Sequence, residues 1–159
     1  MRLMTFSLVQ AARTRAYLAL GHEVLSPAAA QFLAIAFSER GRNGSTTAAT
    51  LGCSLSMVNS RFARAGLPSP RQLVVHARLV VAADLLERYH ASAADVALGL
   101  DYSSPQAFAR TVHLVTGCTI GTFRATLGGD RMLEQFRTTL IVPYRVIWSS
   151  LAVLARAAA

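Results

Sequence analysis

Gln106 and Arg110 have the spacing and the chemistry to recognise a flat, polar edge. They lie four residues apart in the stretch PQAFAR, which places them on one face if the stretch is helical. A glutamine amide donates and accepts hydrogen bonds at once, which suits adenine, and an arginine fork suits the O6 and N7 acceptors of guanine. Phe108 lies between them and is expected to point into a core. The spacing therefore predicts a helix with one polar face and one buried face.

An earlier stretch carries a second polar face of the same kind. Its expected members are Ser56, Asn59 and Ser60. They share a helical face opposite to the one led by Val58 and Phe62. Asn suits adenine and Ser contacts many base edges, although ordinary surface residues would give the same pattern. The face has no charge of its own, so Arg61 and Arg64 on either side of it are the expected phosphate contacts.

The charge balance of the chain favours an anionic partner. The 159 residues include 16 basic and 8 acidic side chains, for a formal net charge of +8, and every basic one is Arg. A GC-rich genome would explain Arg in place of Lys, but it would not explain the sign of the charge. A small domain with this excess favours nucleic acid, with an anionic membrane as the second choice.

Patterns typical of enzymes and metal sites are absent from the sequence. Cys53 and Cys118 form no Cys-x-x-Cys pair, and the four histidines are scattered. We find no Ser-His-Asp set, no paired carboxylates and no Gly-rich phosphate loop. We therefore expect no catalytic residue, no metal and no cofactor. Two isolated cysteines are typical of a reduced, intracellular protein, so we expect the protein in the cytoplasm.

Capping signals delimit the helices that must position these residues. Ser-Pro pairs at 26–27, 69–70 and 104–105 predict helix starts, as does Ser92 with Asp95. Gly41, Gly66 and Gly117 predict helix ends. No stretch alternates with a period of two, so the fold class expected is all-α. The helices expected lie near residues 5–19, 27–40, 45–51, 55–65, 70–88, 93–99, 105–116 and 120–126, with a long segment from about 130.

Two of these helix pairs have the form of a helix-turn-helix. Residues 45–66 and 92–117 each contain a short helix, a tight turn and a longer helix that ends at Gly. The helix expected between them, over 70–88, spans roughly 28 Å at about 1.5 Å per residue. Because successive turns of the major groove are about 34 Å apart, such a spacer lets both second helices enter neighbouring grooves.

The sequence resembles the DNA-binding domain of the AraC/XylS family of bacterial transcription regulators over about residues 27–126. Four pieces carry the resemblance: the series Ala48, Gly52, Ser54, Val58 and Phe62; RLVVAADLL at 78–86; VALGLDYSSPQAFAR at 96–110; and GCTIGTFR at 117–124. The resemblance implies two homeodomain-like helix-turn-helix subdomains joined by a long linker helix. It also implies groove contacts at the two polar faces, with Ser104 and Ala107 beside Gln106 and Arg110, and phosphates held near capped helix starts.

The chain departs from the family pattern at four positions. Asp101 stands where the family usually has Gly, and Asp tolerates a positive φ better than most residues. Val112 replaces a usual Phe, Ile120 replaces the closing Pro, and Ala63 stands where a basic residue is common. In the linker, Asp84 and Glu87 are expected to be exposed or to pair with Arg78 and Arg88 of the same helix.

The two ends of the chain lie outside the resemblance. Residues 1–26 form an amphipathic segment too short for a sensory domain, and 127–159 are expected to form an amphipathic helix kinked near Pro143. Its apolar stripe comprises Leu133, Phe136, Leu140, Tyr144, Ile147, Leu151 and Leu154, widened by Trp148. The stripe covers the domain's own core or forms a homodimer contact through 130–159; membrane association is the weakest alternative.

These features predict a sequence-specific transcription regulator, not an enzyme, that binds double-stranded DNA in two adjacent major-groove segments. It would act in the cytoplasm at the nucleoid, with RNA polymerase as a candidate protein partner and no membrane role. The alternative is a divergent AraC-like fold that serves as a protein-interaction or dimerisation module and binds DNA weakly or not at all. Salt-dependent binding to DNA distinguishes the two.

Overall fold

The computed structural model describes residues 6–21 and 23–152, and every regular element within them is helical. The helices are α1 (Phe6–Leu18), α2 (Pro27–Phe37), α3 (Gly44–Thr50), α4 (Leu55–Ala65), α5 (Pro70–Arg88), α6 (Ala93–Gly99), α7 (Pro105–Thr116), α8 (Ile120–Thr126), α9 (Gly129–Phe136) and α10 (Arg145–Ser150). The all-α prediction is confirmed. From residue 27 to 126, each expected helix is present within three residues of its expected bounds.

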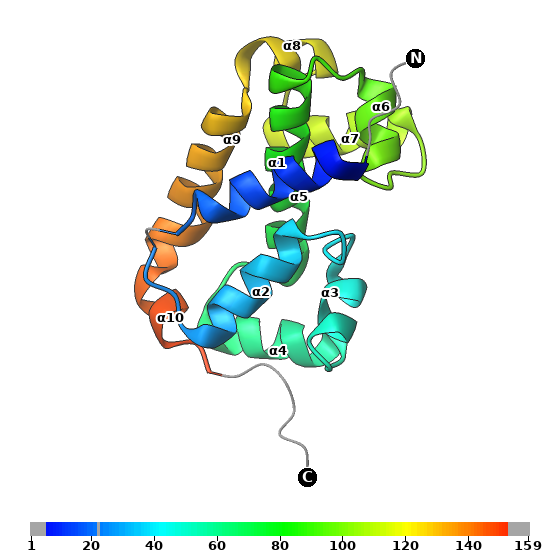
Figure 1. Cartoon of the computed structure of the whole chain (residues 1–159). Helices are drawn as coiled ribbons and strands as arrows, with labels where there is room; N and C mark the ends of the chain where they lie inside the picture. The colour runs from blue at the N-terminus through cyan, green and yellow to red at the C-terminus, as the bar shows by residue number, and fades with distance from the viewer. Residues whose placement is uncertain (1–5, 22, 153–159) are drawn as a thin grey trace.

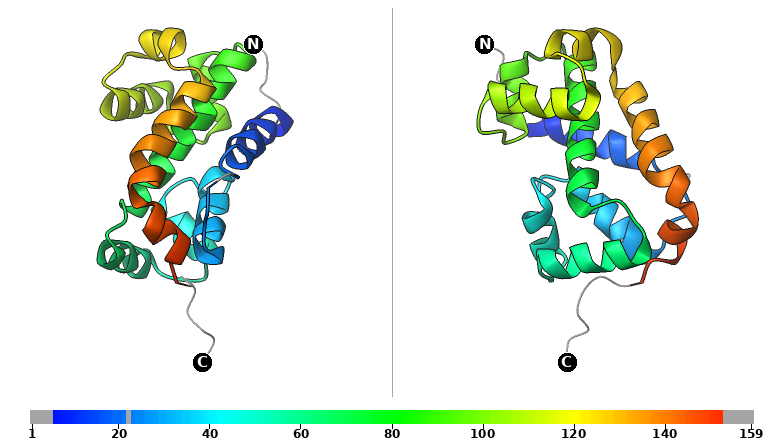
Figure 2. Two further views of the ribbon diagram at one scale, coloured as in Figure 1. Left: turned by 90° about the vertical axis from the view of Figure 1, so that its left-hand side faces the viewer. Right: turned by 180° about the vertical axis from the view of Figure 1, so that it is seen from behind.

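The long helix α5 is the axis of the molecule. The pair α3 and α4 lies at its first end, and the pair α6 and α7 lies at its second end (Figure 1). Helix α1 crosses α5 on the face seen in Figure 1, and α9 runs along its side toward α10. Figure 2 shows α4 and α7 on the same side of the molecule, opposite to α1. The second helix of each pair is therefore presented on one common face.

Serine caps start the helices where the sequence predicts them. Ser26, Ser69 and Ser104 each accept a hydrogen bond from the backbone N–H three residues later, at 3.0 to 3.2 Å. Pro follows each of them at the first helical position, where its missing N–H costs nothing. Ser92 and Asp95 form the complete reciprocal capping box. These caps fix the starts of α2, α5, α6 and α7.

The same box sets the charge state of a solvent-exposed carboxylate. Hydrogen bonds from the Ser92 hydroxyl and then from the Ser92 backbone N–H hold the pKa of Asp95 below its usual value. The unfolded chain lacks these bonds, so the contribution of Asp95 to stability is present above its unfolded pKa. It is lost as the pH falls through its lower folded pKa.

Two of the three predicted glycine ends are confirmed, and one is wrong. Gly66 and Gly117 end α4 and α7 in the left-handed region, with φ of 78° and 72°. Helix α2 ends at Phe37 rather than at Gly41, because Ser38 takes an extended ψ of 175° and its hydroxyl accepts the Arg40 N–H. Gly41 instead packs against the end of α2, where a Cβ would lie 2.3 Å from the Ala36 carbonyl oxygen.

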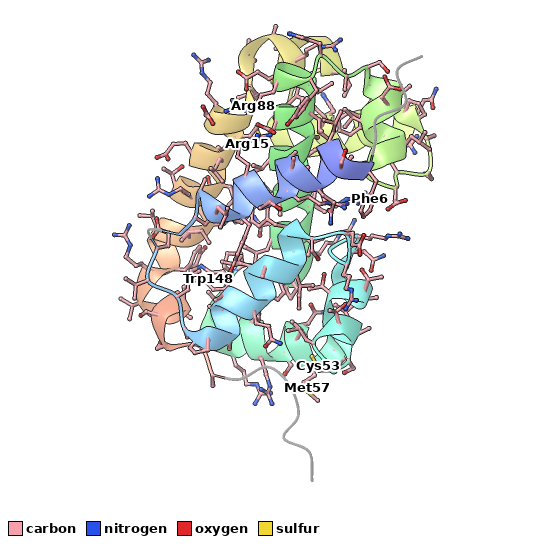
Figure 3. All side chains as sticks on the ribbon, viewed as in Figure 1. Phe6, Arg15, Cys53, Met57, Arg88 and Trp148 are labelled. Carbon is pink, nitrogen blue, oxygen red and sulfur yellow. The ribbon has the colours of Figure 1, made fainter. Side chains whose placement is uncertain are left out.

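The linker helix α5 is buried through its second half, including one charged residue. Every residue from 79 to 86 is buried, and Asp84 is among them. Its carboxylate accepts from Arg15 of α1 and from Arg88 of α5, both at 2.7 Å. Figure 3 shows these two arginines side by side where α1 crosses α5. The expected pairing with Arg88 is confirmed, and the expected exposure of Asp84 is wrong.

The C-terminal segment is helical from residue 129 to residue 150 and is irregular around Pro143, where the kink is expected. After α9 the chain forms a π-helical turn over Arg137–Ile141, a 3-10 turn over Val142–Tyr144, and then α10. Pro143 has no N–H to donate and its ring clashes with the preceding turn, so a continuous α-helix is excluded there. Within residues 129–150 the expected helix thus consists of four successive helical pieces, and Leu154 lies outside the described residues.

The apolar stripe of this segment packs on the chain's own core, as the first of the three alternatives expects. Phe136 meets Phe37 of α2 edge to face at 5.3 Å, and Trp148 meets Phe62 of α4 at 6.0 Å between ring centroids. The indole Nε1 of Trp148 donates to the Leu140 carbonyl oxygen at 2.9 Å. Phe136, Leu140 and Trp148 are buried and cannot contact a second copy, whereas the remaining described members of the stripe are half-buried: Leu133, Tyr144, Ile147 and Leu151. Within the described residues no helix has the length and apolar character needed to cross a membrane.

Trp148 should therefore be a major contributor to stability. We expect Trp148→Ala to lower the free energy of unfolding by about 3–5 kcal/mol, because it empties a fully buried site against Phe62. Val146 is 80% exposed two residues away, and Val146→Ala is the matched control, expected to change stability by less than about 0.5 kcal/mol. Urea unfolding of both variants measures this, and equal losses would contradict the packing.

Candidate nucleic-acid interface

The first helix-turn-helix unit is built from α3, a turn over 51–54, and α4. The turn closes with a hydrogen bond from the Cys53 N–H to the Ala48 carbonyl oxygen at 3.0 Å. Gly52 adopts a φ of 71° within it, and the Ser54 hydroxyl caps α4. Val58 and Phe62 are buried, which turns the opposite side of α4 outward. The residue types at these positions thus fix which face of α4 is exposed.

The second unit repeats this construction with α6 and α7. The Tyr102 N–H donates to the Ala97 carbonyl oxygen at 2.8 Å, which repeats the bond from residue 53 to residue 48. Asp101 takes the place of the glycine with a φ of 56°. Phe108 and Val112 are the buried pair, so the aromatic and the aliphatic residue have exchanged positions relative to the first unit. The two units are structural repeats on either end of α5.

A family model described as a helix-turn-helix domain, of the AraC type, matches residues 47–126, half of the chain. The chain belongs to the AraC-type helix-turn-helix family. The match starts within α3 and ends with α8, so it includes both turns and the linker helix. A search of curated proteins gave no match, and a search of solved structures gave none either.

This membership confirms the resemblance that the sequence predicts. The structure shows how the chain accommodates its four departures from the family pattern. Asp101 does adopt the positive φ that the usual glycine would adopt, as expected of a residue that tolerates it. Val112 is fully buried in place of the usual Phe. Ile120 opens α8 without a proline, because the Thr119 hydroxyl caps the helix by accepting the Thr122 N–H. Ala63 is exposed on α4.

On α4 the polar face expected of an AraC-type reading helix is exposed. Its members are Ser56, Asn59 and Ser60. Arg64, also exposed, donates to the Ser60 hydroxyl at 3.1 Å and to its carbonyl oxygen at 3.4 Å. Arg61 is half-buried. The structure thus brings Ser56, Asn59, Ser60 and Arg64 to the exposed side of α4, with Arg61 at its edge and with one of the serines already bound to an arginine of the same helix.

On α7 the second polar face is exposed, and its side chains form fewer contacts within the protein than those of α4. Gln106 and Arg110 are both exposed, and neither forms a side-chain hydrogen bond or ion pair with another described residue. Ala107 and Ser104 are half-buried, and the Ser104 hydroxyl oxygen accepts the Ala107 N–H at 3.0 Å. That hydroxyl keeps its own proton to donate to a phosphate. Gln106 and Arg110 are therefore available to a ligand without breaking an internal contact.

A cluster of charged groups ties the two units together. Arg78 of α5 donates to the Arg42 carbonyl oxygen at 2.9 Å on one side and to the Leu100 carbonyl oxygen on the other. Its guanidinium lies 4.0 Å from the centroid of the Tyr102 ring. Arg42 itself pairs with Asp101 at 3.1 Å. The loop before α3 and the turn after α6 are thus connected through one residue of the linker.

The sequence reasoning did not find the contribution of Arg42, because no motif places residue 42 beside residue 101. Helix α1 also reaches this region. Burial lowers the pKa of the Arg13 guanidinium from its usual value, while the charge of Asp101 and then that of Glu39 oppose the shift. The pairing of Arg42 with Asp101, the acidic residue of the second turn, is visible only in the folded structure.

The candidate metal ligands and the thiols of the described residues are dispersed. Among residues 6–21 and 23–152, no group of three His, Cys, Asp or Glu side chains is placed to hold a metal ion. Cys53 and Cys118 are half-buried free thiols, and burial raises the pKa of the Cys53 thiol above its usual value. A thiol with a raised pKa is a poor nucleophile at neutral pH. The polar faces of α4 and α7 remain the candidate site.

The left-handed turns predict a specific ranking of variants. Asp101→Ala and Asp101→Gly both remove the pair with Arg42, but only Ala carries the steric cost of a positive φ, of about 1–2 kcal/mol. We expect the Ala variant to be less stable than the Gly variant by about that amount in urea unfolding. Gly52→Ala is the matched comparison in the first turn and should lose a similar amount, since φ there is 71° and an added Cβ meets nothing within 4 Å, so the backbone strain is the cost it adds. Equal stability of the two Asp101 variants would contradict the left-handed geometry.

Proposed function

We propose that this AraC-type chain is a transcription regulator that binds double-stranded DNA in two successive major-groove segments. Helix α4 enters one segment and α7 enters the next. In the first, Ser56, Asn59 and Ser60 face the base edges. In the second, Gln106 and Arg110 read adenine and guanine, beside the methyl group of Ala107. Arg61, Arg64 and the hydroxyl of Ser104 contact phosphates.

The observation that supports this proposal best is the common orientation of the two exposed helix faces. Helices α4 and α7 lie on one side of the molecule (Figure 2), at the two ends of a linker helix about 28 Å long. The two units are tied to each other through Arg78 and the pair of Arg42 with Asp101. Both faces can then meet one face of a duplex at once, and the net charge of +8 attracts it.

The proposed role places the protein at the nucleoid in the cytoplasm, and RNA polymerase is the protein partner that regulation of transcription implies. The alternative role as a dimerisation module through 130–159 has less support, because Phe136, Leu140 and Trp148 of that segment are buried within the chain.

The proposal predicts strongly salt-dependent binding to duplex DNA. The full chain is incubated with a pool of randomised 30-base-pair duplexes, bound duplexes are amplified and sequenced, and the dissociation constant of the enriched sequence is measured from about 50 to 200 mM salt. Neutralising several phosphates should weaken binding by about 10³-fold or more over this range. Absence of binding at low salt, or an affinity that does not change with salt, would refute the proposal.

Gln106 and Arg110 should determine sequence preference rather than general affinity. We expect Gln106→Ala and Arg110→Ala each to weaken binding to the enriched duplex by about 1–3 kcal/mol. Binding to an unrelated duplex should fall much less for Gln106→Ala. Exposed residues of α9 provide the matched controls, Gln135→Ala and Arg131→Ala, expected to leave the preference unchanged. An equal loss on both duplexes would show that Gln106 does not read bases.

A further inference from the structure

The first two turns of α5 carry an exposed polar strip that no motif accounts for. Arg71 and Gln72 are exposed, and Val75 and His76 one turn later are half-buried on the same face. From residue 79 to 86 the helix is buried on all sides. Apart from Glu87 and Arg88 in its last turn, the exposed residues of the linker thus lie in its first turn, directly after the chain leaves α4.

This strip forms one wall of a cleft, and α7 forms the other. The cleft has a volume of about 290 Å³, and Thr111 and Leu114 of α7 face the strip across it. None of its lining residues is acidic, and Arg71 and His76 provide its basic groups. Arg71 makes no hydrogen bond or ion pair with another described residue. The cleft thus carries positive charge without an internal partner for it.

The strip also carries hydrogen-bond donors, and one of its side chains, His76, is held by a contact within the helix. The His76 ring lies with Nδ1 2.7 Å from the Gln72 carbonyl oxygen. A carbonyl oxygen only accepts, so Nδ1 carries the proton, and Nε2 is the nitrogen left for another partner. The Gln72 amide and the five N–H groups of Arg71 lie on the same strip and donate hydrogen bonds. These are the donors that phosphate oxygens accept from.

We propose that this strip is a third DNA-binding surface, which contacts the phosphates between the two groove segments. The inference rests on the proposed function, since α4 and α7 must first bind the same duplex. In Figure 2, right, the first half of α5 lies between α4 and α7 on the side that presents them. Two successive major-groove segments on one face of a duplex are separated by a minor groove bordered by two phosphate strands. Arg71, Gln72 and His76 are placed to face those strands.

DNA is the occupant that the observations favour because the strip is continuous with both reading helices. Arg71 follows α4 by one short loop, and the opposite wall of the cleft is α7 itself. A duplex bound by α4 and α7 must pass over the strip. Such contacts carry no sequence information, but they set the register of the protein on the duplex.

The test compares Arg71→Gln with Arg131→Gln in the full chain. Arg131 is an exposed arginine on α9, which packs along another side of α5. Both variants lose one positive charge, so any effect of net charge alone is the same in the two variants. The probes are the 30-base-pair duplex enriched by the unmodified chain and an unrelated duplex of the same length. For each, the dissociation constant is measured as a function of salt.

We expect Arg71→Gln to reduce the slope of log affinity against log salt by about one, by a similar amount on both probes. Arg131→Gln should leave the slope unchanged. A duplex that carries one neutral methylphosphonate between the two groove segments should bind the unmodified chain more weakly than the ordinary duplex does. The Arg71→Gln variant should bind the two duplexes with equal affinity. If the unmodified chain binds no duplex, the proposed function fails. If it binds and Arg71→Gln keeps the full slope, only the third surface is refuted.

Discussion

The placement of the two helix-turn-helix units depends on the guanidinium of Arg78. A guanidinium is flat and presents its N–H donors in a fixed fork, so two acceptors bound to it are held in a fixed geometry. Here the acceptors are the carbonyl oxygens of Arg42, in the loop that leads into the first unit, and of Leu100, in the second unit, and the Tyr102 ring packs against the flat face. A lysine ammonium at this position would bind as a point charge and would leave the angle between the units loosely defined.

The remainder of α5 is held by helices outside the family match. Asp84 is buried, and its charge is balanced by Arg15 from α1 and by Arg88, which also lies 3.4 Å from Asp130. The Glu87 carboxylate accepts the Gly129 N–H at 2.8 Å, at the start of α9. Further along, Arg137 pairs with the buried Glu23 of the α1–α2 connection at 2.7 Å. Helices α1 and α9 thus brace the linker, and through it the two reading helices.

Local chemistry made most of the fold predictable from the sequence, and long-range contacts account for most of what was not. Caps such as Ser104 with Pro105 act within four residues, so their effect is readable in the chain itself. Ser38 ended α2 early because its own backbone and hydroxyl competed with the helix, a signal weaker than the glycine that follows it. The burial of Asp84 depended on Arg15, 69 residues away, and no periodicity reveals such a partner. For the site, spacing predicted which side chains of α4 and α7 are exposed, but not the strip on α5.

The two reading faces are unequal, and the rigid connection between them compensates for this. The face of α4 has uncharged side chains, and Ser60 is already bound by Arg64, so its own affinity for a groove is low. The face of α7 offers Gln106 and Arg110 without internal partners. In the proposed complex, binding of α7 to one groove segment would leave α4 close to the next one at a high effective concentration, because the hydrogen bonds of Arg78 connect the two units without a flexible linker. A weak reading face is then sufficient, because the entropy of bringing it to DNA is lost once for both units.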